Sequence, residues 1–210
     1  MIHHIRPHKL FHLITAQNMA ERLVSVVLPS EYSPMTFGTT ILIAITKIAQ
    51  PLKYFETFIY TLDMNKNDFT ETEHTVNQHD KKLILRSIEH REKTAFPDTP
   101  YEKRIVQLYG DSNKYNFSKL YGLMNMVYID GGHDRKTLLS DTKNALCMIS
   151  DEAYNCIVWH DYTNPNHPQV TQYLEDFSTD KTFDLFHVEE STFCFAFPNA
   201  PPSLNTKFLE

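Results

Sequence analysis

Four predicted β-strands end at or just before an aspartate, and these carboxylates are the strongest sign of chemistry in the chain. In an open α/β sheet, ligands bind at the carboxyl ends of the strands, so four parallel strands would bring the carboxylates to one edge. We expect that edge to be the functional site. The aspartates are Asp63, Asp111, Asp130 and Asp161.

The segments YIDGGH and VWHDY contain the most specific pair of strand ends. Asp130 and His160 are separated by about the length of one crossover helix and one strand, so they should end neighbouring strands. Carboxylates brought together repel one another unless a cation neutralises them. We therefore predict a divalent metal, magnesium or manganese, held by Asp130, His160 and Asp161. In the alternative, the two aspartates cap the following segments or bond to backbone amides.

His133 follows Asp130 closely, and the two intervening glycines leave the backbone room to approach a ligand. A neutral imidazole, with an ordinary pKa of about 6.5, suits a general base that takes a proton from a substrate hydroxyl. We predict His133 and Asp130 as catalytic residues. The alternative for His133 is a surface histidine that caps the helix starting near Asp134.

Several of the same strand ends are candidates for binding a nucleotide-like cofactor. An acidic residue after the second strand of such a fold can accept both ribose hydroxyls, about 20 positions after a glycine-rich turn. Asp63 follows Gly38 at a similar spacing. Asp111 and Ser112 could bond an adenine amine or form an Asx turn. The candidate cofactor-binding residues are Gly38, Asp63, Asp111, Ser112 and Asp130.

The elements that must position these residues alternate between strands and helices, which predicts crossover units. We expect a Rossmann-like, doubly wound α/β fold whose mostly parallel sheet ends in a C-terminal antiparallel strand pair. A single domain should span residues 1–210, with a helical segment at 1–30 and a tail at 198–210. The predicted strands are 54–63, 104–112, 126–130, 155–161, 183–191 and 192–198, and the predicted helices after residue 30 are 39–50, 81–92, 135–149 and 169–177.

The bulk composition excludes several classes of protein. The chain has 210 residues with a net charge of −6, and it lacks the basic balance that general nucleic-acid binding needs. Its apolar runs are far too short for a membrane span. The three cysteines form no C-x-x-C pair, which favours a reducing, cytoplasmic location. The sequence leaves the oligomeric state open, with a homo-oligomer among the alternatives.

Residues 104–177 resemble the second half of a class I S-adenosylmethionine-dependent methyltransferase. The resemblance rests on YIDGGH and WHDY at their spacing, with YTLD and GDS in support. The closest subgroup is the small bacterial type with an IDG-x-H strand end and a later HDY. The resemblance is fair over residues 39–63 and poor before them.

The resemblance implies a role for each matched residue. Asp63 corresponds to the acid that holds the ribose hydroxyls, and Asp111 with Ser112 to the turn beside the adenine. Asp130 corresponds to the fourth-strand acid near the methyl donor, which binds magnesium together with later acids in metal-dependent O-methyltransferases. In the same comparison, Asp161 matches one of those later acids, His160 stands where some members carry another aspartate, and His133 stands at the position of a catalytic base.

The resemblance leads us to expect an O-methyltransferase that acts on a small hydroxylated molecule or a sugar. The chief departure is the donor loop, because LPSEYSPMTFGTT holds Gly38 alone where the family has closely spaced glycines. Either Glu31 or Glu56 could be the acid that accompanies that loop. One alternative is therefore a non-catalytic or partner-dependent methyltransferase-like domain, and another is a metal-dependent hydrolase.

Overall fold

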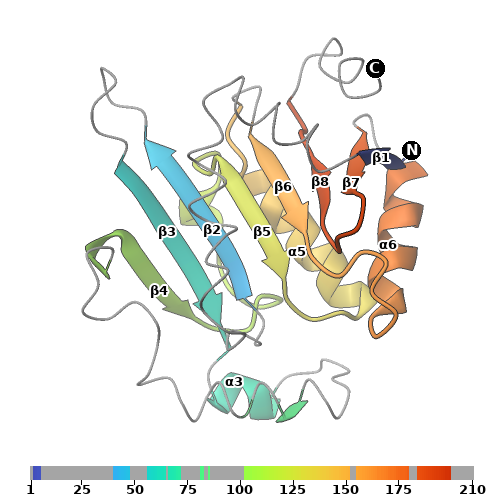
Figure 1. Ribbon diagram of the computed structural model, residues 1–210. Coiled ribbons are helices and arrows are strands. Elements are labelled where there is room, and N and C mark those ends of the chain that lie inside the picture. The colour runs from blue at the N-terminus through green and yellow to red at the C-terminus, as the bar shows by residue number, and fades with distance from the viewer. Residues whose placement is uncertain are drawn as a thin grey trace.

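A computed structural model gives the arrangement of most of the second half of the chain and parts of the first (Figure 1). It describes residues 2–5, 40–47, 56–64, 66–71, 81–82, 85, 102–151, 155–179 and 184–199. Gly38, Glu31, most of the helical segment predicted at 1–30 and most of the tail predicted at 198–210 lie outside the described residues.

The described strands form one eight-stranded sheet with the order β1-β7-β8-β6-β5-β2-β3-β4. Six of these strands run in one direction, and β2 and β8 run in the opposite direction. The protein is therefore a mixed α/β protein with a mostly parallel sheet. The strands are β1 (Ile2–Ile5), β2 (Thr40–Lys47), β3 (Glu56–Asp63), β4 (Ile105–Tyr109), β5 (Met126–Asp130), β6 (Cys156–Trp159), β7 (Leu185–Val188) and β8 (Cys194–Ala196).

The predicted C-terminal strand pair is confirmed. Strands β7 and β8 are antiparallel neighbours, and the backbone N–H of Val188 donates to the carbonyl of Phe193 at 3.1 Å across their turn. Glu190 has a φ of 62° in this turn, a left-handed conformation that reverses the chain within a few residues. Strand β8 thereby returns to pair with β6.

The prediction of a helix over 39–50 was wrong, because Thr40–Lys47 forms β2. This strand lies antiparallel between β3 and β5, with Ile41 opposite both Leu62 and Ile129. Isoleucine and threonine are β-branched and favour strands, and a continuous apolar run is typical of a strand inside a sheet. The helical spacing of isoleucines was therefore the weaker of two signals.

The N-terminal segment was also mispredicted where it is described. Ile2–Ile5 forms β1, which pairs in parallel with β7 at the edge of the sheet. His3 lies within 3.3 Å of Asp184, and its ring stacks on Phe186. These contacts join the two ends of the described chain, a long-range pairing that no local pattern in residues 1–30 indicates.

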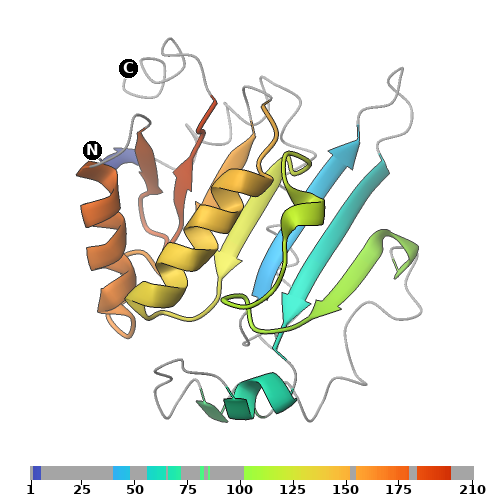
Figure 2. The same ribbon diagram turned by 180° about the vertical axis from the view of Figure 1, so that it is seen from behind.

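Two helices cover one face of the sheet, as Figure 2 shows from behind. They are α5 (Arg135–Met148) and α6 (Pro168–Thr179). Helix α5 connects the parallel neighbours β5 and β6, so these three elements form the crossover unit that the sequence predicts. The remaining described helical segments are α3 (Lys66–Glu71) and the two short 3-10 turns Glu102–Arg104 and Ser118–Leu120, and Lys81, Lys82 and Leu85 are also helical.

The core lies between these helices and the sheet. Trp159 is fully buried on β6, and its indole Nε1 donates a hydrogen bond of 3.0 Å to Thr142 on α5. Phe177 of α6 packs against the same indole ring, with 5.9 Å between the ring centroids. One side chain thus joins both helices to the strand that leads into His160, which fixes the end of β6 in place.

No described helix has both the length and the apolar character that crossing a membrane would require. Cys147, Cys156 and Cys194 are all free thiols. Burial raises the pKa of the Cys156 and Cys194 thiols to about 12, so both are protonated and unreactive at neutral pH.

We expect Asp134→Ala to destabilise the fold by about 1 kcal/mol, because the Asp134 carboxylate is the N-cap of α5. It accepts hydrogen bonds from the backbone N–H groups of Lys136 and Thr137, and from the Thr137 hydroxyl at 2.6 Å. Urea unfolding followed by circular dichroism measures the change. Asp134→Asn is the matched control, because asparagine also caps helices well; an equal loss in both variants would contradict the capping role.

Candidate functional site

The carboxyl ends of β3, β4, β5 and β6 lie at one edge of the sheet, the lower edge in Figure 1. Asp130 is the last residue of β5, and His160 follows the last residue of β6. These strands are parallel neighbours with Ile129 opposite Trp159, so the two strand ends lie side by side. The His160 backbone N–H donates to the Ile129 carbonyl at 3.0 Å and continues this pairing one residue further.

The structure brings Asp130, His160 and Asp161 together into one cluster. The His160 imidazole Nδ1 lies 3.2 Å from Asp130 Oδ1 and 3.1 Å from Asp161 Oδ2. Their donor atoms all lie within 4.8 Å of one another. Asp161 is buried, with its side chain 7% exposed, whereas Asp130 and His160 keep 21% and 25% exposure. The cluster therefore opens to solvent on the side of Asp130 and His160.

The cluster is strongly polarised. Burial by itself lowers the pKa of His160, but the contacts with Asp130 and Asp161 outweigh burial and raise this pKa to about 10. Burial likewise raises the pKa of Asp161, yet the hydrogen bonds from His133 and Asn164 and the charge contact with His160 outweigh it and hold this pKa well below its usual range. Asp161 is therefore an ionised carboxylate near neutral pH, and it requires positive charge beside it.

The donor atoms fit a divalent cation. His160 Nδ1 is buried and has no hydrogen-bond partner among the described residues, although two carboxylate oxygens lie within 3.2 Å. The two contacts are therefore short enough for ion pairs, but their geometry is not that of hydrogen bonds. Ligand atoms about 2.1 Å from one ion lie roughly 3.0 to 3.4 Å apart in octahedral or tetrahedral sites. The observed spacings match that range, so a cation could replace the proton on this imidazole.

The backbone at Asp161 is held in an uncommon conformation. Its φ is 64°, and Thr163 has the same value, so two non-glycine residues occupy the left-handed region within one turn. The Asn164 side-chain amide donates to Asp161 Oδ1, and the Asn164 backbone N–H donates to the Asp161 carbonyl. Strain of this kind concentrates at functional sites, where the surrounding contacts hold it.

His133 joins the cluster from the turn after β5. Its Nε2 lies 3.0 Å from Asp161 Oδ2, in hydrogen-bond geometry. The helix cap is supplied by Asp134 instead, so the alternative of a capping histidine does not hold. Gly132 has a packing role, because a Cβ there would lie 3.0 Å from Thr137 Cγ2 in the first turn of α5.

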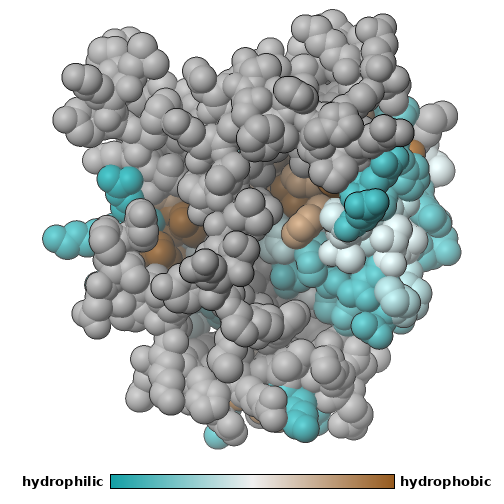
Figure 3. Space-filling model, in the orientation of Figure 1, coloured by the Kyte–Doolittle hydropathy of each residue, from teal (hydrophilic) through white to brown (hydrophobic). Residues whose placement is uncertain are grey.

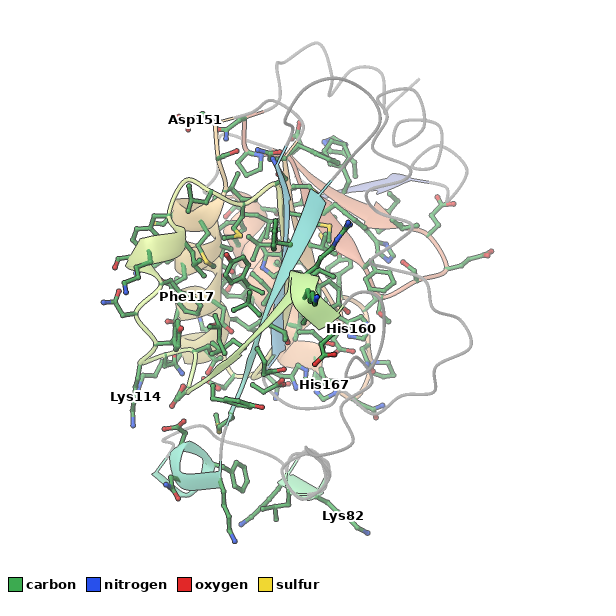
Figure 4. All side chains as sticks on the ribbon, turned by 90° about the vertical axis from the view of Figure 1, so that its left-hand side faces the viewer. Lys82, Lys114, Phe117, Asp151, His160 and His167 are labelled. Carbon is green, nitrogen blue, oxygen red and sulfur yellow. The ribbon has the colours of Figure 1, made fainter. Side chains whose placement is uncertain are left out.

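His167 is a further member of the site that the sequence reasoning missed. It directly precedes α6, and its ring stacks on His133 with 3.6 Å between centroids. His133, Asp161 and His167 form a second group whose donor atoms lie within 4.8 Å of one another. The available signal was its position, since His167 lies in the same connection after β6 as Asp161. Figure 4 shows His160 and His167 below the centre of the molecule, while Asp151 lies near its top.

Asp63 reaches the same edge but not the same cluster. It ends β3, and β2 lies between β3 and β5, so Asp63 and Asp130 are two strand spacings apart, roughly 10 Å. The side-chain amide of Gln107 donates to Asp63 Oδ2 at 2.8 Å. A molecule that contacts both Asp63 and Asp130 must therefore span the start of β2, where Thr40 pairs with Asp130.

Asp111 and Ser112 follow β4 at the same edge and are buried. Asp111 Oδ1 accepts a hydrogen bond of 2.9 Å from the backbone N–H of Asn113, which is the Asx turn left open by the sequence. The Ser112 hydroxyl is buried and has no hydrogen-bond partner among the described residues. A buried hydroxyl without a partner is costly, which makes Ser112 the polar group here that a ligand could satisfy.

The described surface beside the cluster is polar. On the face of Figure 3, hydrophilic residues gather at the lower right, where Figure 1 places the connection from β6 to α6. Behind the cluster, the His160 ring packs against Phe193 with 5.1 Å between centroids. The cluster therefore has a polar surface beside it and an aromatic contact through His160.

Comparison with known proteins does not identify a family. No family model matches the chain, and no curated protein matches it. The function must therefore be inferred from the residues of the site.

We expect Asp161→Asn to weaken Mn²⁺ binding by at least about tenfold, because even outer contacts to a metal site contribute that much. The variant removes the charge of the carboxylate that both His133 and His160 contact. Equilibrium dialysis with metal analysis measures binding. Asp151→Asn, an exposed aspartate at the opposite end of the molecule, is the control. Equal binding by both variants and wild type, with native circular dichroism spectra, would contradict a metal role for Asp161.

Proposed function

We propose that the protein is a class I S-adenosylmethionine-dependent methyltransferase. In this proposal it methylates an oxygen of a small hydroxylated molecule or a sugar. A divalent cation, Mn²⁺ or Mg²⁺, is held by Asp130, His160 and Asp161. The observation that carries the proposal is this Asp–His–Asp cluster at the carboxyl ends of two adjacent parallel strands.

The order of the strands supports the Rossmann-like part of the proposal. If β2 is counted as the first strand, the sheet from β4 to β6 has the order 3-2-1-4-5 of a doubly wound fold. The order reverses between β2 and β5, where such folds bind ligands, and Asp130 ends one of those two strands. The departure is the direction of β2, whose start rather than its end lies at this edge. Gly38 precedes that start by two positions in the sequence.

Two described residues support donor binding next to the cluster. Asp63 ends β3, the second strand in this numbering, where a carboxylate can accept the two ribose hydroxyls of an adenosyl group. Ser112 follows β4, the third strand, and has the buried hydroxyl that needs a partner. Both lie on the same side of β2, away from Asp130, so the donor would run along the edge with its sulfonium end toward Asp130.

In this proposal the residues of the cluster position the acceptor and receive its proton. The acceptor oxygen would attack the methyl carbon in line with the sulfur, and the carbon–sulfur bond would break with its electron pair left on sulfur. S-adenosylmethionine would supply the methyl group, and a cation held by Asp130, His160 and Asp161 would lower the pKa of the acceptor hydroxyl. The proton goes to His133 or to a carboxylate of the cluster, and Asp130 is the more exposed carboxylate. Positioning supplies most of the acceleration.

A metal-dependent hydrolase is a second candidate, and one observation favours it. The sequence suggested no second metal-binding motif, but His133, Asp161 and His167 lie together as a second group of donors. Two adjacent metal sites are common in enzymes that hydrolyse phosphate esters. Turnover of an aryl phosphate with Mn²⁺, together with no binding of S-adenosylhomocysteine, would select this candidate over the methyltransferase.

We expect wild-type protein to bind S-adenosylhomocysteine, and Asp63→Ala to weaken that binding by about tenfold or more. The expected loss reflects hydrogen bonds from hydroxyls to a charged group, each contributing roughly 1.5 to 3 kcal/mol. Isothermal titration calorimetry measures the affinity directly.

Asp151→Ala is the matched control, because it removes an exposed aspartate at the opposite end of the molecule. The role of Asp63 would be refuted by equal affinity in Asp63→Ala and wild type. If the wild type does not bind S-adenosylhomocysteine, the proposal of a methyltransferase is itself contradicted. Transfer of a labelled methyl group to a panel of catechols and sugars then identifies the acceptor class.

A further inference from the structure

The second group of donors, His133, Asp161 and His167, comes from two connections that are distant in sequence. His133 belongs to the turn between β5 and α5, and the other two belong to the connection between β6 and α6. Their donor atoms lie within 4.8 Å of one another, and the contact from His133 Nε2 to Asp161 Oδ2 is 3.0 Å. This spacing falls in the same range as that of the first group, so the second group also has the geometry of a cation site.

His167 is held in place by its own backbone. Its N–H donates to the Asn164 carbonyl at 3.0 Å, and its carbonyl accepts from the N–H of Val170 at 3.0 Å in the first turn of α6. The Asn164 side chain in turn donates to Asp161. The connection after β6 therefore folds back on Asp161, which fixes the position from which the His167 ring faces His133.

The Asp161 carboxylate is shared by the two groups. Its Oδ2 atom lies 3.0 Å from His133 and 3.1 Å from His160, while Oδ1 is held by Asn164. A carboxylate oxygen that faces a different imidazole in each group is suitable for bridging two cations. In proteins with two adjacent metal ions, the ions lie about 3.5 to 4 Å apart.

The two groups differ in chemistry. The first offers two carboxylates and one imidazole, a set that suits Mn²⁺ or Mg²⁺, while the second offers two imidazoles and one carboxylate. Imidazole-rich sets favour Zn²⁺, Mn²⁺ and Fe²⁺ and disfavour Mg²⁺. The two positions should therefore prefer different divalent cations.

We propose that His133, Asp161 and His167 bind a second divalent cation, and that Asp161 bridges it to the cation on Asp130 and His160. His133 is then a metal ligand, which leaves a carboxylate to take the proton in the methyl-transfer mechanism. A pair of cations would bind an acceptor that presents two adjacent oxygens or an oxyanion. The two cation sites share Asp161, so the second site rests on the first cation site of the proposed function. It does not rest on methyl transfer.

The test is the number of Mn²⁺ ions bound by protein first stripped with a chelator. Equilibrium dialysis with metal analysis should give two ions per chain for wild type, one for His167→Gln and one for His160→Gln. His4→Gln, which changes a histidine on β1 outside both groups, should keep two. Electron paramagnetic resonance should show coupled Mn²⁺ ions in wild type and uncoupled ions in the two single-site variants.

Three results would overturn the second site. One is a single ion in wild type that His167→Gln does not affect, which leaves the first site intact. Another is a single ion lost in both His167→Gln and His160→Gln, which means that one cation uses both groups. The third is no bound ion at all, which also removes the cation from the proposed function, whereas binding of S-adenosylhomocysteine tests the methyltransferase separately.

Discussion

The ionised carboxylate of Asp161 is the constraint on which the site depends. A buried anion is unstable unless positive charge or hydrogen-bond donors surround it. Asp161 is almost fully enclosed, and it contacts His133 from the turn after β5 and both His160 and Asn164 from its own connection after β6. The left-handed backbone at Asp161 turns the chain so that these donors can reach it. The arrangement of the edge of the sheet follows from satisfying this one group.

The rest of the described fold supports that position. Trp159, two residues before Asp161, is anchored to both helices, and the parallel pairing of β5 and β6 sets Asp130 beside His160. The Asp134 cap starts α5 immediately after His133, which fixes the length of the turn that carries this histidine. The polar groups thus lie on strand ends and short connections, and the rigid strands and helices hold these connections in place, as is usual for binding sites on α/β sheets.

Much of the second half could be predicted from the sequence because local patterns agree there. Strand 126–130, the Asp134 cap and helix 135–149 form a compact crossover unit whose signals all lie within one segment. Residues 40–47 were misread because isoleucines at 41 and 45 fit a helix, although the continuous apolar, β-branched run was the stronger signal and is typical of a strand inside a sheet. The pairing of β1 with β7 joins residues at opposite ends of the chain, and local patterns carry no information about it. His167 was missed because its contact with His133 depends on a folded loop.

The most direct test of the account is a crystal structure of the protein grown with Mn²⁺ and S-adenosylhomocysteine. We expect an anomalous manganese peak about 2.2 Å from Asp161 Oδ2, with the ribose of the nucleoside bound to Asp63. A structure in which Asp161 contacts only His133, His160 and Asn164, with no manganese beside it at saturating concentration, would contradict it.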